Sequence, residues 1–303
     1  MDTFASMLEL QAVLLVYLAV GALCKRLGVI GGEGERTLND LVVNVCMPCL
    51  IFNSFKDITS EVLVQALAAL GVSCAMCALA WVLGRIIWRR CPAPTQGPLR
   101  YGTMISNCGF AGLPLAEQTF GSVGLIYASV YLIPIRFFMW TAGVTMLSGE
   151  RRPAGEVARK IATNPCVIAV FMGLARGLLA VELPEFADTA LSGIASTVSP
   201  LSMMLVGAIA ADADPRTTLE PTVLAFCGVR LVLMPLVSLG LCTLLGLDDT
   251  ITGTCLLMAA MPAAATTTLL SAQYGADAAF AAKLVSLSTA LSIVTTPVLM
   301  LLL

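Results

Sequence analysis

Stretches of about 20 mostly apolar residues recur along the whole chain and constrain its fold more than any other feature. Each stretch is long enough to cross a lipid bilayer as a helix. Of the 303 residues, 58% are hydrophobic and 12% are charged, whereas about 25% of the residues in an ordinary soluble domain are charged. The longest polar connection, about residues 148–163, is too short for a soluble domain. We therefore predict an all-α protein that crosses the membrane many times.

Ten such stretches are predicted as transmembrane helices. They cover approximately residues 8–27, 38–55, 61–88, 100–121, 123–147, 163–181, 186–211, 219–246, 251–273 and 276–302. With the N-terminus outside, twelve Lys and Arg residues fall in the inside connections, and only Lys56 and Arg176 fall outside. Because basic connections favour the cytoplasm, we expect both termini outside and a cytoplasmic connecting loop at residues 148–162. The first residues carry no basic cluster, so we expect the first span to be retained rather than cleaved as a signal peptide.

The two halves of the chain match each other in the placement of their prolines. The halves are residues 1–147 and 163–303, with five predicted spans each. An odd number of spans per half gives the halves opposite orientations. Pro48 and Pro200 lie in the second span of their halves, and Pro114 and Pro262 lie in the fourth. This weak match predicts two inverted-topology repeats.

The fourth and ninth spans are each interrupted by a proline beside small residues. The interruptions are GFAGLP (Gly109 to Pro114) and AAMPAAATTT (Ala259 to Thr268). Proline removes a backbone hydrogen bond, and hydrocarbon cannot satisfy the groups that it frees. Such a break survives only where it faces protein or a water-filled cavity. Two breaks at matching places therefore predict a transporter substrate site near the middle of the membrane.

The residue types around the breaks favour an anionic substrate. A half-helix that begins after each break presents unpaired N–H groups and a positive dipole end, which suit a carboxylate. The residues expected to line the site are Asn107, Cys108, Gly109, Gly112, Pro114, Pro262, Ala263, Thr266 and Thr267. No nucleophile with a neighbouring base accompanies them, so an enzyme is not predicted.

Five ionisable residues lie at membrane depth, where charge is costly and a functional role is the default hypothesis. Lys283, about two turns into the last span, is expected to attract the anion or to neutralise Glu117. Arg136 and Arg230 fit structural pairing and substrate attraction equally well. Arg176, near the end of its span, fits snorkelling to the membrane surface.

Three side chains near the breaks are candidates for binding a coupling ion. They are Glu117, Gln118 and Gln273. A buried carboxyl group can carry a proton, and carboxylate and amide oxygens can also bind sodium. Proton and sodium coupling therefore both stay open at this point.

Several classes of protein and site are not predicted. Histidine is absent, which removes the commonest metal ligand. The CxxC pairs among the eleven cysteines, Cys46/Cys49 and Cys74/Cys77, lie inside apolar helices and fit packing rather than redox or metal chemistry. No basic patch is interleaved with aromatic residues, so nucleic acid is not an expected partner. We expect no metal and no cofactor.

Four segments of the chain resemble the auxin efflux carrier family of secondary transporters, within the superfamily that includes the bile-acid:sodium symporters. The segments are NVCMPCLIFNSF (44–55), SNCGFAGLPLAEQTFG (106–121), MAAMPAAATTTLLSAQYGAD (258–277) and LSTALSIVTTPVLMLLL (287–303). With the number of spans, the resemblance covers essentially the whole chain. It adds Asn44 to the expected substrate site and places Asn107 beside a crossing formed at Pro114 and Pro262.

The resemblance also implies an architecture and a function. Spans 1, 2, 6 and 7 would form a scaffold, and spans 3–5 and 8–10 a transport domain that moves as an elevator with broken spans 4 and 9 crossed. Family members carry organic anions such as auxin, malonate and malate, and often dimerise through the scaffold. This chain lacks the long central loop of plant auxin carriers, so it resembles a compact bacterial member in the inner membrane. The alternatives are a sodium-coupled symporter of the bile-acid type and a membrane sensor that does not transport.

Overall fold

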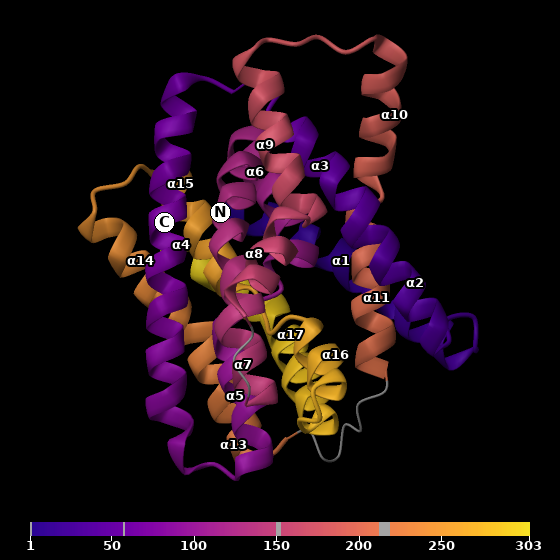
Figure 1. The fold of residues 1–303 in the computed structure, drawn as a ribbon, viewed down its shortest axis with the longest axis vertical. Helices are drawn as coiled ribbons and strands as arrows, with labels where there is room; N and C mark the ends of the chain where they lie inside the picture. Colours follow the sequence, from indigo (N-terminus) through magenta and orange to yellow (C-terminus); the bar gives the residue numbers. More distant parts are fainter. Residues whose placement is uncertain (1, 57, 150–152, 212–218) are drawn as a thin grey trace.

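The computed structural model describes residues 2–56, 58–149, 153–211 and 219–303, which form helices joined by short connections (Figure 1). The α-helices are α1 (Asp2–Arg26), α2 (Gly32–Leu41), α3 (Met47–Ser54), α4 (Ser60–Ile87), α5 (Ala93–Met104), α6 (Leu113–Phe138), α7 (Val144–Ser148), α8 (Ala154–Ala162), α9 (Pro165–Leu178), α10 (Glu185–Ser196), α11 (Val198–Ala211), α13 (Pro221–Gly228), α14 (Met234–Leu244), α15 (Asp249–Ala260), α16 (Thr266–Gln273) and α17 (Ala278–Met300). Short π-helical turns continue several of them, at Val42–Cys46, Cys108–Gly112, Met139–Gly143 and Val229–Leu233.

Side chains at the helix starts explain several of these boundaries. Thr59, Asn164, Asp248 and Asp277 each accept a hydrogen bond from a backbone N–H in the first turn of the helix that follows. These caps satisfy donors that have no partner within the helix. The polar connections thus set where the apolar helices begin.

Five helical segments of the described residues are long and apolar enough to cross a membrane, or six if the bent pair α8 and α9 counts as one span. The five are Glu61–Arg90, Cys108–Ser148, Glu185–Ala211, Pro221–Leu244 and Ala278–Met300. The protein is therefore a multi-pass, helical membrane protein. The ten spans and their inverted repeat remain predictions, because the halves of an interrupted helix are each too short to meet this criterion.

The segment from Cys108 to Ser148 turns at Gly121. Its 41 residues would extend over about 60 Å as one straight helix, twice the thickness of the hydrocarbon core. Gly121 has φ +66° and ψ −158°, which interrupts the helical path and which glycine adopts without a steric penalty. The turn lies at the boundary predicted between the fourth and fifth spans.

Glycines bring helices from the two halves of the chain into close contact. A Cβ atom on Gly207 of α11 would lie 1.9 Å from the carbonyl oxygen of Leu18 in α1. A Cβ atom on Gly177 of α9 would lie 2.2 Å from the carbonyl oxygen of Phe55, just after α3. Small residues allow such close packing where lipid provides no hydrophobic drive between helices.

The helices pack as two groups. In one group, α1 packs on α11, and α3 packs on α9 and α10. In the other, α4 packs on α5 and α6, α15 on α6 and α14, and α16 on α17. Figure 1 shows α4 and α14 towards one side of the molecule and α2, α10 and α11 towards the other.

The connection between the halves differs from the expected loop at residues 148–162. Residues 154–162 form the helix α8, which bends by 55° into α9. The helix is amphipathic, with Val157 buried and with Arg159 and Lys160 in its last turn. A sequence with one apolar face gains stability by laying that face on the protein, so the connection folds as a helix.

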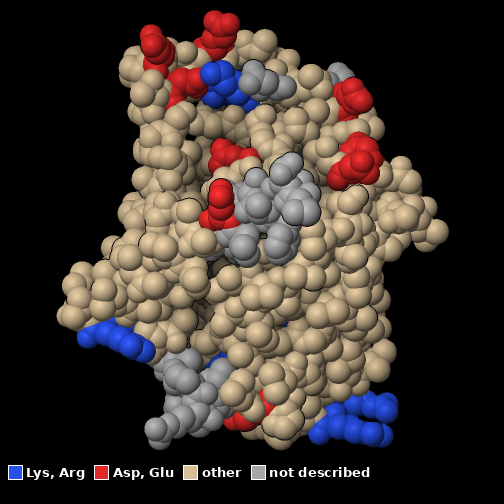
Figure 2. Space-filling view, turned by 180° about the vertical axis from the view of Figure 1, so that it is seen from behind, with Lys and Arg blue, Asp and Glu red and all other residues tan. Residues whose placement is uncertain are grey.

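Charged side chains are distributed unevenly along the long axis. In Figure 2, most visible Asp and Glu side chains lie in the upper half, and most visible Lys and Arg side chains lie at the lower end. The exposed middle belt is mostly uncharged, as expected for a surface that faces lipid.

Candidate functional site

Two interrupted helices cross in the interior of the molecule. Residues 105–107 separate α5 from the helix that resumes at Cys108, and residues 261–265 separate α15 from α16. Ser106 and Ala263 pair there as a short antiparallel β-bridge. The two breaks are thus in contact in the structure, and their assignment to the fourth and ninth of ten spans stays a prediction.

The crossing satisfies the backbone groups that the breaks set free. The Asn107 N–H donates to the Pro262 carbonyl at 2.8 Å, and the Ala264 N–H donates to the Ile105 carbonyl at 3.3 Å. The Ala263 N–H donates to Ser288 Oγ of α17 at 3.2 Å. Unpaired backbone groups would be costly at this depth, so each break depends on the other.

The first break does not lie where Pro114 predicted it. The chain leaves the helix at residues 105–107 and is helical again from Cys108, so Pro114 lies in a continuous helix. Pro114 has no N–H group that could donate to the Phe110 carbonyl oxygen one turn earlier. That oxygen instead accepts a hydrogen bond from Ser202 Oγ of α11 at 3.0 Å. A hydroxyl from the other half of the chain therefore replaces the lost bond. The second break contains Pro262, as predicted.

A cavity of about 800 Å³, here named the crossing cavity, opens beside the two breaks. Five residues of the expected substrate and ion sites line it: Asn44, Asn107, Gly109, Thr266 and Gln273. Further polar residues that line it are Glu35, Arg36, Asn39, Asp40, Arg136 and Asn164. The cavity therefore combines the predicted break residues with charged and amide side chains from α2, α6 and the start of α9.

Arg136 lies beside the first break. A Cβ atom on Gly109 would lie 3.2 Å from Arg136 Nη2, so the absence of a side chain on Gly109 makes room for the guanidinium. Arg136 Nε is buried without a hydrogen-bond partner, and Nη1 reaches only the Met139 sulfur at 3.9 Å. Among the described residues no carboxylate forms an ion pair with Arg136. This side chain, which the sequence left undecided, adds a positive charge to a cavity wall that Glu35 and Asp40 also line.

Arg230 is another arginine close to the crossing, and it is buried. It is 3% exposed and lies in the π-helical turn before α14. Its electrostatic neighbours are Cys77, Cys108 and Tyr131, and within the described ranges no carboxylate pairs with it. Because Cys108 has both Arg136 and Arg230 as electrostatic neighbours, the crossing lies in a positive field.

Several expected site residues support the crossing without lining the crossing cavity. Cys108 is fully buried, and its thiol donates to the Met258 carbonyl at 3.0 Å. A Cβ atom on Gly112 would lie 2.8 Å from the Met258 sulfur, so Gly112 allows the first broken helix to pack on α15. Ala263 and Thr267 are also fully buried. These residues hold the two breaks together.

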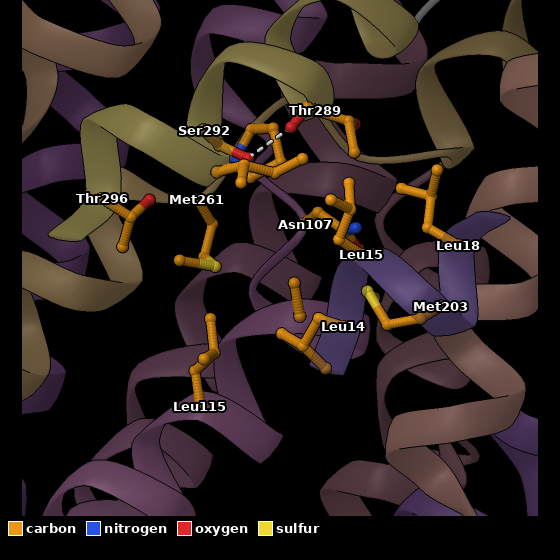
Figure 3. A pocket seen from close by; sticks show the side chains of 13 residues that line it. Leu14, Leu15, Leu18, Asn107, Leu115, Met203, Met261, Thr289, Ser292 and Thr296 are labelled. Carbon is orange, nitrogen blue, oxygen red and sulfur yellow. Dashed lines mark hydrogen bonds between the residues drawn. The ribbon is translucent and has the colours of Figure 1, made fainter. Parts of the chain in front are cut away.

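A second, much smaller space also borders the two breaks. Its volume is about 30 Å³, enough for about two water molecules. Figure 3 shows that Asn107 reaches this small space, with Leu14, Met203 and Thr289 around it. Pro262 also lines it. The crossing cavity is therefore by far the larger of the two spaces beside the breaks.

Lys283, Glu117 and Gln118 do not contribute to the crossing cavity. Lys283 lies in a separate pocket of about 310 Å³ and forms an ion pair with Glu220 at 2.5 Å. The prediction that Lys283 neutralises Glu117 is therefore wrong. Glu117 and Gln118 are exposed on α6, and of the three coupling-ion candidates only Gln273 lines the cavity.

Arg176 pairs within the protein rather than snorkelling. It is 6% exposed, donates to Asp188 Oδ1 at 2.5 Å and lies 5.2 Å from the Phe52 ring centre. The Lys56 Nζ atom forms a second ion pair with the same carboxylate, 2.6 Å from Asp188 Oδ2. The partner could not be found from the local sequence because Asp188 belongs to the next helix.

A helical membrane protein whose interrupted helices meet beside a large polar cavity has the architecture of a transporter. The family model described as "Membrane transport protein" matches residues 6–157 and 151–300, essentially the whole chain. The chain belongs to this family, which confirms the resemblance to the auxin efflux carriers.

Similar proteins carry transporter names. An "Uncharacterized transporter" of Methanothermobacter thermautotrophicus is 27% identical over 292 residues, 93% of this chain and 94% of the relative. A "Putative malonate transporter" of Rhizobium meliloti is 25% identical over 289 residues, 91% of this chain and 89% of the relative. An "Uncharacterized transporter" of Methanocaldococcus jannaschii is 25% identical over 309 residues, 94% of this chain and 95% of the relative.

Proposed function

We propose that this protein carries a small organic anion across the membrane, a mono- or dicarboxylate that binds in the crossing cavity. The observation that carries the proposal is Arg136, a partly buried side chain beside the first break. Its Nε atom is buried without a hydrogen-bond partner, and it forms no ion pair among the described residues. A guanidinium binds a carboxylate through two parallel hydrogen bonds. A partly buried cation without a protein partner is costly, and a bound anion would offset that cost.

The backbone at the crossing supports the same ligand. Directly after the two breaks, new helical segments begin at Cys108 and Thr266. The N-terminal ends of these segments, which carry the positive end of the helix dipole, therefore lie beside the cavity. The Asn107 amide and the Thr266 hydroxyl line the cavity as further hydrogen-bonding groups. A dicarboxylate could place one carboxylate on Arg136 and the other at the polar groups.

The name of one relative narrows the choice of substrate. The Rhizobium meliloti protein is named for malonate, and the match spans 91% of this chain. At 25% identity the substrates of the two proteins need not agree. We therefore propose malonate-like and malate-like dicarboxylates as the first compounds to test, before auxin-like monocarboxylates.

The mechanism that we propose is alternating access of the elevator type, with ten spans in two inverted repeats. In support, α1, α3 and α9–α11 pack mostly on one another, and α4–α6 and α14–α17 do the same. Smaller contacts of α3 with α6 and of α1 with α17 join the two groups. The first group would be the scaffold and the homodimer interface, and the second would move the crossing between the two sides. The bias of basic residues supports termini outside a bacterial inner membrane and a cavity that faces the cytoplasm.

A binding and uptake assay tests the proposal. We expect the purified protein to melt at a higher temperature with malonate or malate, because a ligand that binds only the folded state stabilises it. Proteoliposomes should then take up labelled malonate saturably. Neither binding nor uptake of any carboxylate would contradict the proposal.

The cation in the assay distinguishes the coupling modes. We expect uptake that is unchanged when choline replaces sodium and that responds to an imposed proton gradient or membrane potential. Uptake that requires sodium would support the bile-acid type of symporter instead. Binding without uptake under every gradient would support a sensor.

A further inference from the structure

A second large cavity, here named the arginine pocket, lies apart from the crossing. It has a volume of about 610 Å³ and shares no lining residue with the crossing cavity. Its walls come from α4, α5, α6, α8 and the turn that leads into α7. Two arginines, Arg85 and Arg100, line it together with mostly apolar side chains.

The packing of α4 on α5 brings the two arginines together. A Cβ atom on Gly84 would lie in ordinary van der Waals contact with the Arg100 Cα atom, 3.5 Å away, so α4 and α5 lie close together at this point. Arg85, the next residue, stacks on Trp81 with its guanidinium carbon 4.2 Å from the ring centre. The convergence of two like charges is thus a consequence of helix packing.

Among the described residues, no carboxylate pairs with either Arg85 or Arg100. Arg100 donates to Gln96 Oε1 at 2.6 Å, and its Nε is buried without a hydrogen-bond partner. Two guanidinium groups that repel each other beside an unsatisfied donor form a site for an anion.

The rest of the pocket is suited to hydrocarbon. Phe137 and Met146 form one wall, and Val157 and Ile161 of the amphipathic helix α8 form another. The basic connections at this end are predicted to face the cytoplasm, where anionic lipids are concentrated. A ligand that fits both parts has a phosphate head and an apolar tail.

We propose that the arginine pocket binds an anionic phospholipid of the cytoplasmic leaflet. Its phosphate lies between Arg85 and Arg100, and its acyl chains lie along Phe137, Met146 and α8. The helix α8 connects the two halves of the chain, so the lipid fixes this connection against α4 and α5. The proposal does not depend on what the crossing cavity transports.

The test compares three probes on the full-length protein in a neutral detergent: phosphatidylglycerol, phosphatidylcholine and inorganic phosphate. Binding is followed by native mass spectrometry and by melting temperature. We expect phosphatidylglycerol to bind and to raise the melting temperature. Phosphatidylcholine and inorganic phosphate should do neither at the same concentration.

Matched variants assign the binding to the pocket. Arg85→Gln changes an exposed side chain and should fold normally, while weakening phosphatidylglycerol binding about fivefold. Arg89→Gln removes an exposed charge at the same end that does not line the pocket and should leave pocket binding unchanged. Equal effects of the two variants would overturn the site. If phosphatidylcholine or inorganic phosphate bound as strongly as phosphatidylglycerol, the ligand would not be an anionic phospholipid.

Discussion

Arg136 and Arg176 are both cations inside apolar helices, yet the structure gives them opposite surroundings. Arg176 is held by Asp188, Asn53 and the Val181 carbonyl, which together use much of its donor capacity. Arg136 lines a cavity of about 800 Å³ without any carboxylate partner among the described residues. A buried charge with a partner supports the fold, whereas a partly buried charge facing an open cavity is available for a ligand.

The largest expected effect is that of Arg136→Gln on transport. Two charge-assisted hydrogen bonds at about 1.5 kcal/mol each would be lost, which corresponds to roughly 100-fold weaker uptake of a carboxylate. Uptake by Arg136→Lys should lie between that of the wild type and that of Arg136→Gln, because lysine keeps the positive charge but cannot form the two parallel hydrogen bonds of a guanidinium. If Arg136→Gln took up the carboxylate into proteoliposomes at the wild-type rate, Arg136 would not be a substrate-binding residue.

A smaller effect is expected from Gly109→Ala. The added methyl group would lie 2.8 Å from Met47 Cε and 3.2 Å from Arg136 Nη2, so the guanidinium has to move. Displacing a positioning group should raise the KM for the anion by about tenfold. Gly71→Ala is the matched control, since no atom lies within 4 Å of its added methyl group. Equal KM values for the two variants would contradict the contact between Gly109 and Arg136.

Asp188→Asn tests the other arginine. The substitution leaves Arg176 buried without its ion pair, so the melting temperature should fall by several degrees. Transport per folded molecule should be unchanged, because Arg176 does not line the crossing cavity. Lost transport at an unchanged melting temperature would reverse the roles assigned to Arg136 and Arg176.

The smallest expected effect is that of Lys283→Gln. Its ion pair with Glu220 is partly exposed, with side-chain exposures of 21% and 43%, and such pairs contribute about 0–1 kcal/mol. Melting temperature and uptake should both stay close to wild type. Abolished uptake would restore the sequence-based prediction that Lys283 attracts the substrate.

The predictions that succeeded depend on local chemistry. Pro262 interrupts its helix as predicted, and Asn107 and Thr266 line the cavity beside the breaks. Those that failed depend on distant partners. Pro114 does not break its helix because Ser202 supplies a hydrogen bond to Phe110, and Lys283 pairs with Glu220 rather than with Glu117.

The helical, membrane-spanning character of this protein follows from the sequence alone, because the length of an apolar stretch and the cost of unpaired backbone groups in hydrocarbon are local properties. The presence of a polar site at interrupted helices follows for the same reason. Only the tertiary structure decides which cations keep a protein partner and which face a cavity. That choice depends on how the helices pack, and Gly109 contributes to it by leaving room for the Arg136 guanidinium.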